Sequence, residues 1–225
     1  MKKKIVVQEI FPDIYLFEYP NQYQLTSTLI RLQEYYESKF GNIKYKYFTL
    51  EDIIDVYSED NGTFTYFGDW SGFNVPGKAV RSFYKKFFLE HGDLTKKERE
   101  LFDLIIKNIF SYNKTNNFYI IAIYTRRDIN HEFAHAFYYL DKDYKIEINK
   151  LISKYKYKKE VGKWLCRMKY SEEEREDEMQ AYLSTSSRSY LTSLGFLKGW
   201  TIPKEFKSCY QKYKKLWKNK TNCEI

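Results

Sequence analysis

The residues with the clearest chemical meaning are His131, Glu132 and His135, which form a His-Glu-x-x-His sequence. On a helix, residues four apart differ by about 40° of rotation and one turn of rise, so both imidazoles can reach one ion. Glu132 borders the same region, where it can take a proton from a zinc-bound water. Because the chain holds only 3 histidines, chance produces this pattern in roughly one such sequence in a few hundred. The spacing predicts two zinc ligands and a general base.

The helix that carries this motif is expected to begin after Asp128, a suitable N-cap. Its apolar residues form a stripe at helical spacing, made up of Ile129, Phe133, Phe137 and Leu140. The alternative interpretation is a helix with two surface histidines and a helix-favouring glutamate, and no metal. The stripe argues against it, because it places the histidines beside the core-facing surface, as the wall of a pocket requires.

A third ligand must come from another part of the chain, because a catalytic zinc ion has three protein ligands and a water. His91 lies upstream, and the downstream His-x-x-Gly-x-x-His arrangement of metzincins is absent from the sequence. A carboxylate from the acidic segment 172–178 is therefore expected. Glu178 is preferred. Glu174 is the rival, one turn earlier on the same face, but it also completes a predicted capping box that begins at Ser171.

These residues resemble the gluzincins, the zinc peptidases that include thermolysin and the smaller cytoplasmic ImmA/IrrE-type proteins. In that group, two histidines of the motif helix are joined by a glutamate of a later helix, in a Glu-x-x-Ala-Asp or Glu-x-x-Ala-Asn setting. His131, Glu132 and His135 match the first part, and Glu178 with Ala181 matches the second. The resemblance implies a zinc metallopeptidase in which His131, His135 and Glu178 bind zinc and Glu132 is the catalytic base.

The sequence departs from the gluzincin pattern at Tyr182, which stands where the relatives have Asp or Asn. Asp177 is the candidate replacement, since its carboxylate can accept the free imidazole N–H of a ligand histidine. A donor for the oxyanion of the reaction is also needed. By chemistry alone the candidates are Tyr182, Tyr138, Tyr139 and His91.

The predicted strand Phe118 to Tyr124 precedes the motif helix. Gluzincins carry an edge strand at this point, which binds extended peptide by strand addition. The resemblance therefore implies a peptide or protein substrate. The alternative function is that of a regulatory or interaction protein that holds zinc without cutting its partner.

The elements that must position these residues follow from hydrophobic periodicity and capping signals. The sequence predicts two short strands within residues 4–18, a helix from Gln22 to Phe40 that stops at Gly41, and a strand followed by an ordered loop over 60–76. A capping box at Thr95 starts a helix that runs to about Ile109. Helices are expected to fill most of the chain after the motif helix.

This order of elements predicts an α+β fold, a mostly helical zincin-like domain with a small N-terminal and central β-sheet. We expect one domain over residues 1–225. Residues 1–125 form its β-containing part with the edge strand, and residues 126–225 form its helical part with the metal site.

The composition fits a globular chain of 225 residues, 43% hydrophobic and 20% aromatic. The longest apolar run, residues 118–124, is too short to span a bilayer, and Gln8 with Glu9 interrupts the N-terminal apolar stretch before a secretory signal can form. A cytoplasmic protein without a membrane segment is therefore expected. Cys166, Cys209 and Cys223 are widely spaced and predict neither a disulfide framework nor a thiolate zinc site.

The formal charge of +8 is densest between Lys204 and Lys220, where seven lysines face one acid, Glu205. Aromatic residues recur there at helical spacing, namely Phe206, Tyr210, Tyr213 and Trp217. This pattern favours a solvated helix with an aromatic face in the core over a nucleic-acid contact. The oligomeric state is not indicated by the sequence.

Overall fold

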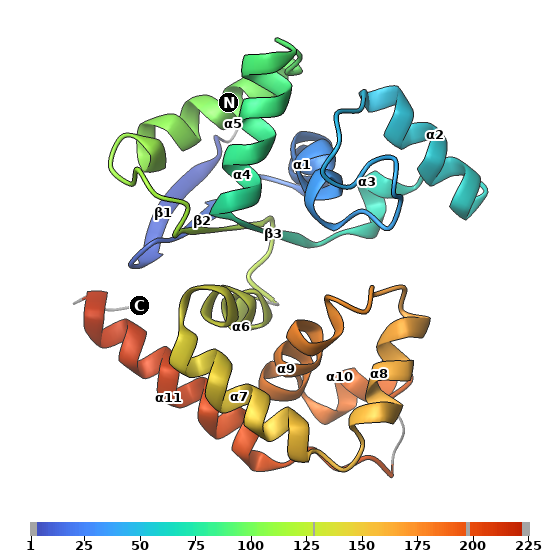
Figure 1. The fold of residues 1–225 in the computed structure, drawn as a ribbon, viewed down its shortest axis with the longest axis vertical. Helices are drawn as coiled ribbons and strands as arrows, with labels where there is room; N and C mark the ends of the chain where they lie inside the picture. Colours follow the sequence, from blue (N-terminus) through green and yellow to red (C-terminus); the bar gives the residue numbers. More distant parts are fainter. Residues whose placement is uncertain (1–3, 128, 197–198, 222–225) are drawn as a thin grey trace. The chain divides into compact units, whose positions relative to one another are not determined.

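The computed structural model describes residues 4–127, 129–196 and 199–221 (Figure 1). The chain divides into two compact units, Met1–Arg127 and Asp128–Ile225. Among the described residues, the first unit combines a four-stranded sheet with helices, and the second unit is helical. The expected α+β class is confirmed.

The sheet of the first unit has the strand order β1-β2-β4-β3. Its strands are β1 (Val6–Phe11), β2 (Ile14–Glu18), β3 (Gly72–Pro76) and β4 (Tyr119–Ile123). β1 and β2, the two short strands predicted within residues 4–18, form an antiparallel hairpin, and Asp13 closes the turn at a φ of 62°. Aspartate tolerates this left-handed conformation better than most residues. β2 and β4 are parallel, so the sheet is mixed.

The predicted strand at 118–124 is present as β4, but its expected role as an edge strand is wrong. Ile121 is paired with Leu16 of β2 on one side and with Asn74 of β3 on the other. The outer strands are β1 and β3. All 5 residues of β4 are buried, which explains the unbroken apolar run that marks this strand in the sequence.

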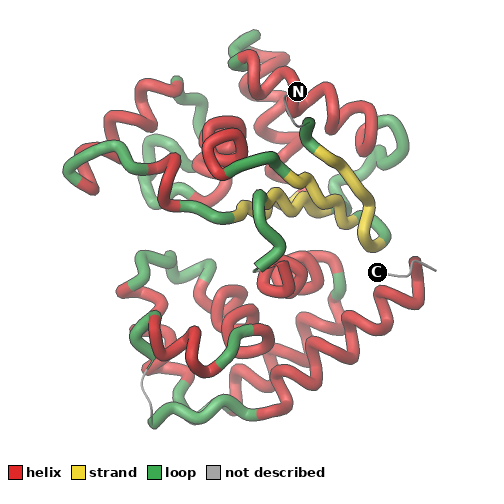
Figure 2. The backbone as a smooth tube through the Cα atoms, turned by 180° about the vertical axis from the view of Figure 1, so that it is seen from behind, coloured by secondary structure: helices red, strands yellow, loops and turns green. Residues whose placement is uncertain are grey.

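The helices of the first unit cover one face of the sheet (Figure 2). They are α1 (Gln22–Glu37), α2 (Leu50–Asn61), α3 (Tyr66–Asp69), α4 (Gly77–Phe83) and α5 (Lys96–Ile105), with π-helical turns at Tyr84–Glu90 and Ile106–Phe110. The capping box at Thr95 is present. The helix predicted to reach Phe40 ends at Glu37, where Ser38 caps it by donating its backbone N–H to Glu34.

The prediction for residues 60–76 has the wrong order. The sequence predicts a strand followed by a loop, whereas the structure has the short helix α3 followed by the strand β3. Tyr66 of α3 is buried, and so are Phe73 and Val75 of β3. Because a short aromatic run buries its rings equally well in either conformation, its periodicity does not separate a helical turn from a strand.

The second unit is an assembly of helices around α9 (Arg175–Thr185), which packs against four others. These neighbours are α6 (Ile129–Leu140), α7 (Lys142–Lys154), α8 (Lys158–Arg167) and α11 (Lys204–Thr221); α10 (Arg188–Ser193) completes the unit. The expectation that helices fill this part of the chain is confirmed. Because α9 lies at the centre, side chains on it are held from several directions.

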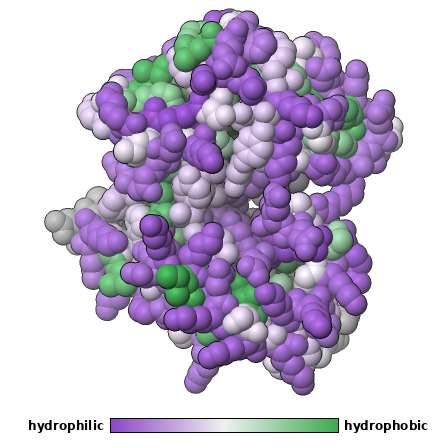
Figure 3. All heavy atoms as spheres, in the orientation of Figure 1, coloured by the Kyte–Doolittle hydropathy of each residue, from purple (hydrophilic) through white to green (hydrophobic). Residues whose placement is uncertain are grey.

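The C-terminal helix α11 has the predicted aromatic face in the core. Phe206, Tyr210, Tyr213 and Trp217 are buried, and most of the lysines between them are exposed. Hydrophilic residues likewise dominate the molecular surface seen in Figure 3. In the described part of the chain, no helix has both the length and the apolar character that crossing a bilayer requires.

Candidate metal centre

The candidate site lies between α6 and α9, which pack directly against each other. α6 carries His131, Glu132 and His135, and α9 carries Glu178. The predicted N-cap, Asp128, lies outside the described residues. Of the predicted apolar stripe, Phe133 and Phe137 are buried, whereas the two end positions, Ile129 and Leu140, are half-buried. The stripe anchors α6 in the unit and leaves the histidines on the side that meets α9.

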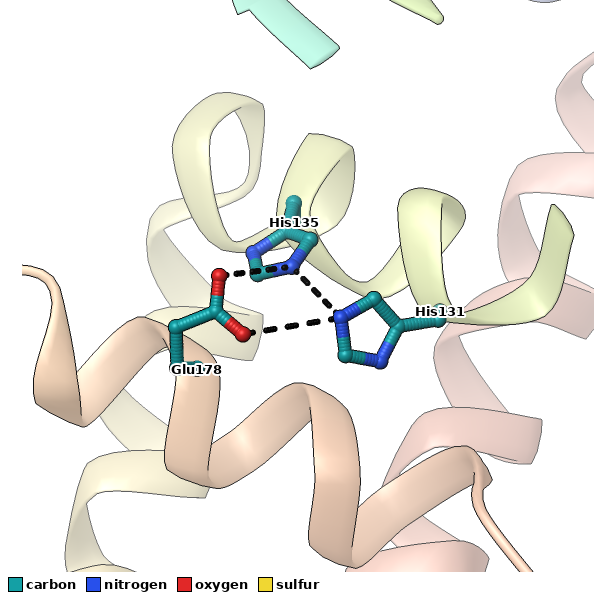
Figure 4. Close-up of side chains that lie close together, drawn as sticks. All are labelled: His131, His135 and Glu178. Atoms are coloured by element: carbon teal, nitrogen blue, oxygen red, sulfur yellow. Dashed lines mark hydrogen bonds and ion pairs between the residues drawn. The ribbon is translucent and has the colours of Figure 1, made fainter. Parts of the chain in front are cut away.

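The three predicted ligands converge on one point (Figure 4). The Nε2 atoms of His131 and His135 are 3.1 Å apart. Glu178 Oε2 lies 3.6 Å from Nε2 of His131, and Glu178 Oε1 lies 3.6 Å from Nε2 of His135. The structure therefore brings Glu178 to two histidines that lie more than forty positions earlier in the chain.

The three side chains could hold one metal ion, because one ligand atom from each lies within 4.8 Å of the others. Ligand bonds of about 2.1 Å at tetrahedral angles place the ligand atoms about 3.4 Å from one another. The two Nε2 atoms are 3.1 Å apart, close to that value, and each lies 3.6 Å from a different oxygen of Glu178. Glu178 Oε2 is also buried without a hydrogen-bond partner. A buried carboxylate oxygen without a hydrogen bond raises the free energy of the folded protein, and coordination of a cation would offset this cost.

The tautomer of His135 is set by Asp177, whose Oδ1 atom lies 2.8 Å from Nδ1 of His135. A carboxylate only accepts hydrogen bonds, so Nδ1 is the donor, and in the neutral ring Nε2 keeps its lone pair. Nε2 is the atom that faces His131 and Glu178. Asp177 thus has the position expected of the partner that replaces the Asp or Asn missing at Tyr182.

Charge balance within the site favours binding of a cation. Burial by itself lowers the pKa of His135, but the negative charges of Asp177 and Glu178 outweigh it and raise this pKa well above its ordinary value. For Glu178, burial raises the pKa, and the charge of His135 with contributions from His131 and the Tyr170 hydroxyl brings it below its ordinary value. The cluster therefore holds a negative carboxylate and, without a metal, a proton on His135.

Glu132, the predicted base, is half-buried on α6. Its charge contributes to raising the pKa of both His135 and Tyr182. This effect requires only that the carboxylate lie near both groups.

The rival ligand Glu174 has a local role and is outside the cluster. Its Oε2 atom accepts the backbone N–H of Ser171 at 3.0 Å, which is one half of the predicted capping box. The other half is missing, because Ser171 Oγ is buried without a partner. The helix accordingly starts at Arg175, later than the sequence predicts. Between the two acids, the structure brings Glu178 to the histidines.

The four candidate oxyanion donors lie in different surroundings. The ring of Tyr182 packs edge-on against His131 at 4.6 Å, and its hydroxyl lies 3.1 Å from that of Tyr170. The hydroxyl of Tyr138 donates to Asn149, and Tyr139 is exposed. His91 belongs to the first unit, where it stacks on Tyr47. Tyr182 is the candidate in direct contact with a predicted ligand.

Sequence reasoning missed three residues that support the site, namely Gln180, Tyr144 and Tyr170. Gln180 donates to Asp177, and Tyr144 donates to Gln180. Gln180 lies three positions after Asp177 on the same helix, so helical spacing would have revealed it as a neighbour. Tyr144 and Tyr170 come from elsewhere in the chain, and no local pattern distinguishes them among 23 tyrosines.

Comparisons of the chain with known protein families, with curated proteins and with solved structures find no match. The functional interpretation therefore depends on the geometry of the site and on the local resemblance of its motifs.

Proposed function

We propose that the protein is a zinc-dependent hydrolase in which His131, His135 and Glu178 bind the metal and Glu132 is the general base. One observation carries the proposal: two imidazole Nε2 atoms 3.1 Å apart each lie 3.6 Å from an oxygen of the Glu178 carboxylate, and one ligand atom from each of the three residues lies within 4.8 Å of the others. Glu178 Oε2, which is buried without a hydrogen bond and faces His131, also supports it.

The chemistry divides between the metal and Glu132. When bound, zinc supplies a Lewis acid that activates water at neutral pH. Glu132 takes one proton from the attacking water as the water oxygen bonds to the carbonyl carbon of the substrate. As the bond to the leaving amine breaks, Glu132 returns that proton to the amine nitrogen. Tyr182 is protonated near neutral pH, as an ordinary tyrosine is, and its ring contacts His131, so it is our candidate donor for the oxyanion.

A peptide or protein substrate belongs to the proposal through the resemblance of the motifs to gluzincins. The topology changes how such a substrate can be held. Both sides of β4 are paired, so a peptide cannot add to this strand. A cytoplasmic location and a function without nucleic acid, both expected from the sequence, remain part of the proposal.

The alternative function, a zinc-holding interaction protein, requires a closed coordination sphere with four protein ligands. Within the described residues, the cluster of metal-binding side chains contains three, His131, His135 and Glu178. Three protein ligands from the described residues are the number that a catalytic zinc site has, which supports a catalytic role over a structural one.

The test of catalysis is the Glu132→Gln variant, assayed with a mixture of fluorogenic peptides after loading with zinc. We expect this variant to retain zinc like the wild type and to lose about 10²- to 10⁴-fold in turnover, because the amide cannot accept the proton. Equal turnover in the two proteins would remove Glu132 from the mechanism. Stoichiometric zinc without hydrolysis by the wild type would favour the interaction protein.

A further inference from the structure

A chain of three hydrogen bonds leads from the candidate metal centre into the core of the second unit. His135 Nδ1 lies 2.8 Å from Asp177 Oδ1, and Gln180 Nε2 donates to the same Oδ1 atom at 2.9 Å. The hydroxyl of Tyr144 donates to Gln180 Oε1 at 2.7 Å. Gln180 and Tyr144 are both 0% exposed. The chain crosses three helices, from α6 through α9 to α7.

Each group in this chain has one compatible role. The Asp177 carboxylate accepts from both neighbours, so His135 and Gln180 must direct N–H groups at it. With its amide nitrogen committed to Asp177, Gln180 presents its oxygen to Tyr144, whose hydroxyl is the donor. Rotating the Gln180 amide by 180° would bring two acceptors together at Asp177. The direction of all three hydrogen bonds is therefore fixed.

Asp177 needs such support, because its side chain is 28% exposed and borders solvent. If it turned outward, the Nδ1 atom of His135 would lose its acceptor, and the ring proton would be free to move to Nε2. That proton would occupy the lone pair that faces His131 and Glu178. Gln180 sits three residues after Asp177 on α9 and is itself held by Tyr144, so it opposes this rotation.

We propose that Gln180 and Tyr144 are positioning residues of the metal centre, which hold Asp177 so that His135 presents its Nε2 lone pair to the ion. The inference rests on the proposed zinc site and deepens it. Neither residue touches the metal or the substrate. They act through Asp177, and their effect must therefore appear in metal binding itself and not only in the stability of the fold.

The experiment compares the wild type with Gln180→Met and Tyr144→Phe. Methionine keeps the length of glutamine without its hydrogen bonds, and phenylalanine removes only the hydroxyl. Tyr155→Phe is the matched control, because Tyr155 is a buried tyrosine of the same unit whose hydroxyl donates to the carbonyl of Thr201. Each metal-free protein is titrated with zinc against a chromophoric chelator, its Co²⁺ absorption spectrum is recorded, and its Tm is measured without metal.

We expect Gln180→Met to weaken zinc binding about 10- to 100-fold and Tyr144→Phe to weaken it severalfold, with altered Co²⁺ bands in both. Tyr155→Phe should bind zinc like the wild type even if its metal-free Tm falls. If Gln180→Met does not fold, Tyr144→Phe carries the test alone.

Unchanged zinc affinity and Co²⁺ spectrum in the folded variants, with only a lower metal-free Tm, would overturn the inference and leave the two residues a structural role. That result is distinct from failure of the zinc site, in which the wild type itself would not bind zinc.

Discussion

His135 and Asp177 form a hydrogen-bonded pair, with Nδ1 and Oδ1 2.8 Å apart, although 42 positions separate them in the chain. The pair links α6 to α9 and turns the Nε2 atom of His135 toward His131 and Glu178. One contact thereby joins two packed helices and orients a candidate metal ligand.

Replacing Asp177 should weaken zinc binding without removing any ligand. Asp177→Ala takes away the acceptor of the His135 N–H, and we expect about a 10- to 100-fold loss of zinc affinity. Asp177→Asn keeps an acceptor oxygen without the charge and should fall between this variant and the wild type. Glu176→Ala is the control, because that neighbouring acid pairs with the exposed Lys158. Equal zinc affinity in Asp177→Ala and Glu176→Ala would refute the role of Asp177.

The identity of the third ligand can be tested with two matched variants on neighbouring turns. Glu178→Gln should lose most of the zinc affinity, because the amide oxygen is a much weaker ligand than the carboxylate. Glu174→Gln should retain it, since Glu174 instead accepts the backbone N–H of Ser171. Equilibrium dialysis followed by metal analysis measures both. Zinc loss in Glu174→Gln with retention in Glu178→Gln would reverse the assignment.

Zinc should stabilise the protein more strongly as the pH rises. In the metal-free protein, burial lowers the pKa of His135, but the charges of Asp177 and Glu178 outweigh it and raise the pKa well above its ordinary value. The stabilisation from this raised pKa is fully present below about pH 6.5, the value of an unfolded histidine, and is lost as the pH rises through the folded pKa. Zinc must displace the same proton, so its binding also strengthens with pH.

The corresponding measurement is the Tm with zinc minus the Tm with chelator, recorded from about pH 6 to 8, around the ordinary histidine pKa. We expect this difference to grow with pH and protons to be released on zinc binding. A difference that shrinks over the same range would contradict the charge state assigned to His135.

A separate prediction concerns the core of the first unit, where Arg31 and Glu98 form a buried bidentate pair. Their two contacts are 2.9 and 2.5 Å long, and their side chains are 1% and 2% exposed. Arg31→Met should lower the free energy of unfolding by about 3–5 kcal/mol, because it leaves the Glu98 charge buried without its cationic partner. Urea denaturation measures the change. The control Lys158→Met removes the exposed pair with Glu176 and should lower the free energy of unfolding by about 0–1 kcal/mol. Similar losses of stability in Arg31→Met and Lys158→Met would contradict the prediction that the buried pair contributes more than the exposed one.

The parts of the site that were predictable are those encoded locally or by motif. His131 and His135 share one helix, so their spacing alone indicates a common ligand direction. Glu178 was identified from the Glu-x-x-Ala resemblance and from the acidity of its segment. Helical spacing also predicts that Gln180 neighbours Asp177. It cannot predict Tyr144, because the position of that residue depends on how α7 packs on α9.

The fold shows the same division between local and non-local information. Capping at Thr95 and the apolar run of β4 are local signals, and both predict their elements correctly. The neighbours of β4 are not encoded within it, since β2 and β3 come from distant parts of the chain. The edge-strand prediction failed for that reason, and with it the expectation of peptide binding along β4.

The central claim is that the chain binds one zinc ion through His131, His135 and Glu178, and metal analysis of the purified protein tests it most directly. The wild type and a variant that combines His131→Ala with His135→Ala are each incubated with zinc, dialysed and analysed for metal per chain. The account predicts close to one zinc per chain in the wild type and close to none in the folded double variant. Wild-type protein without zinc, or a double variant that retains it, would contradict the account.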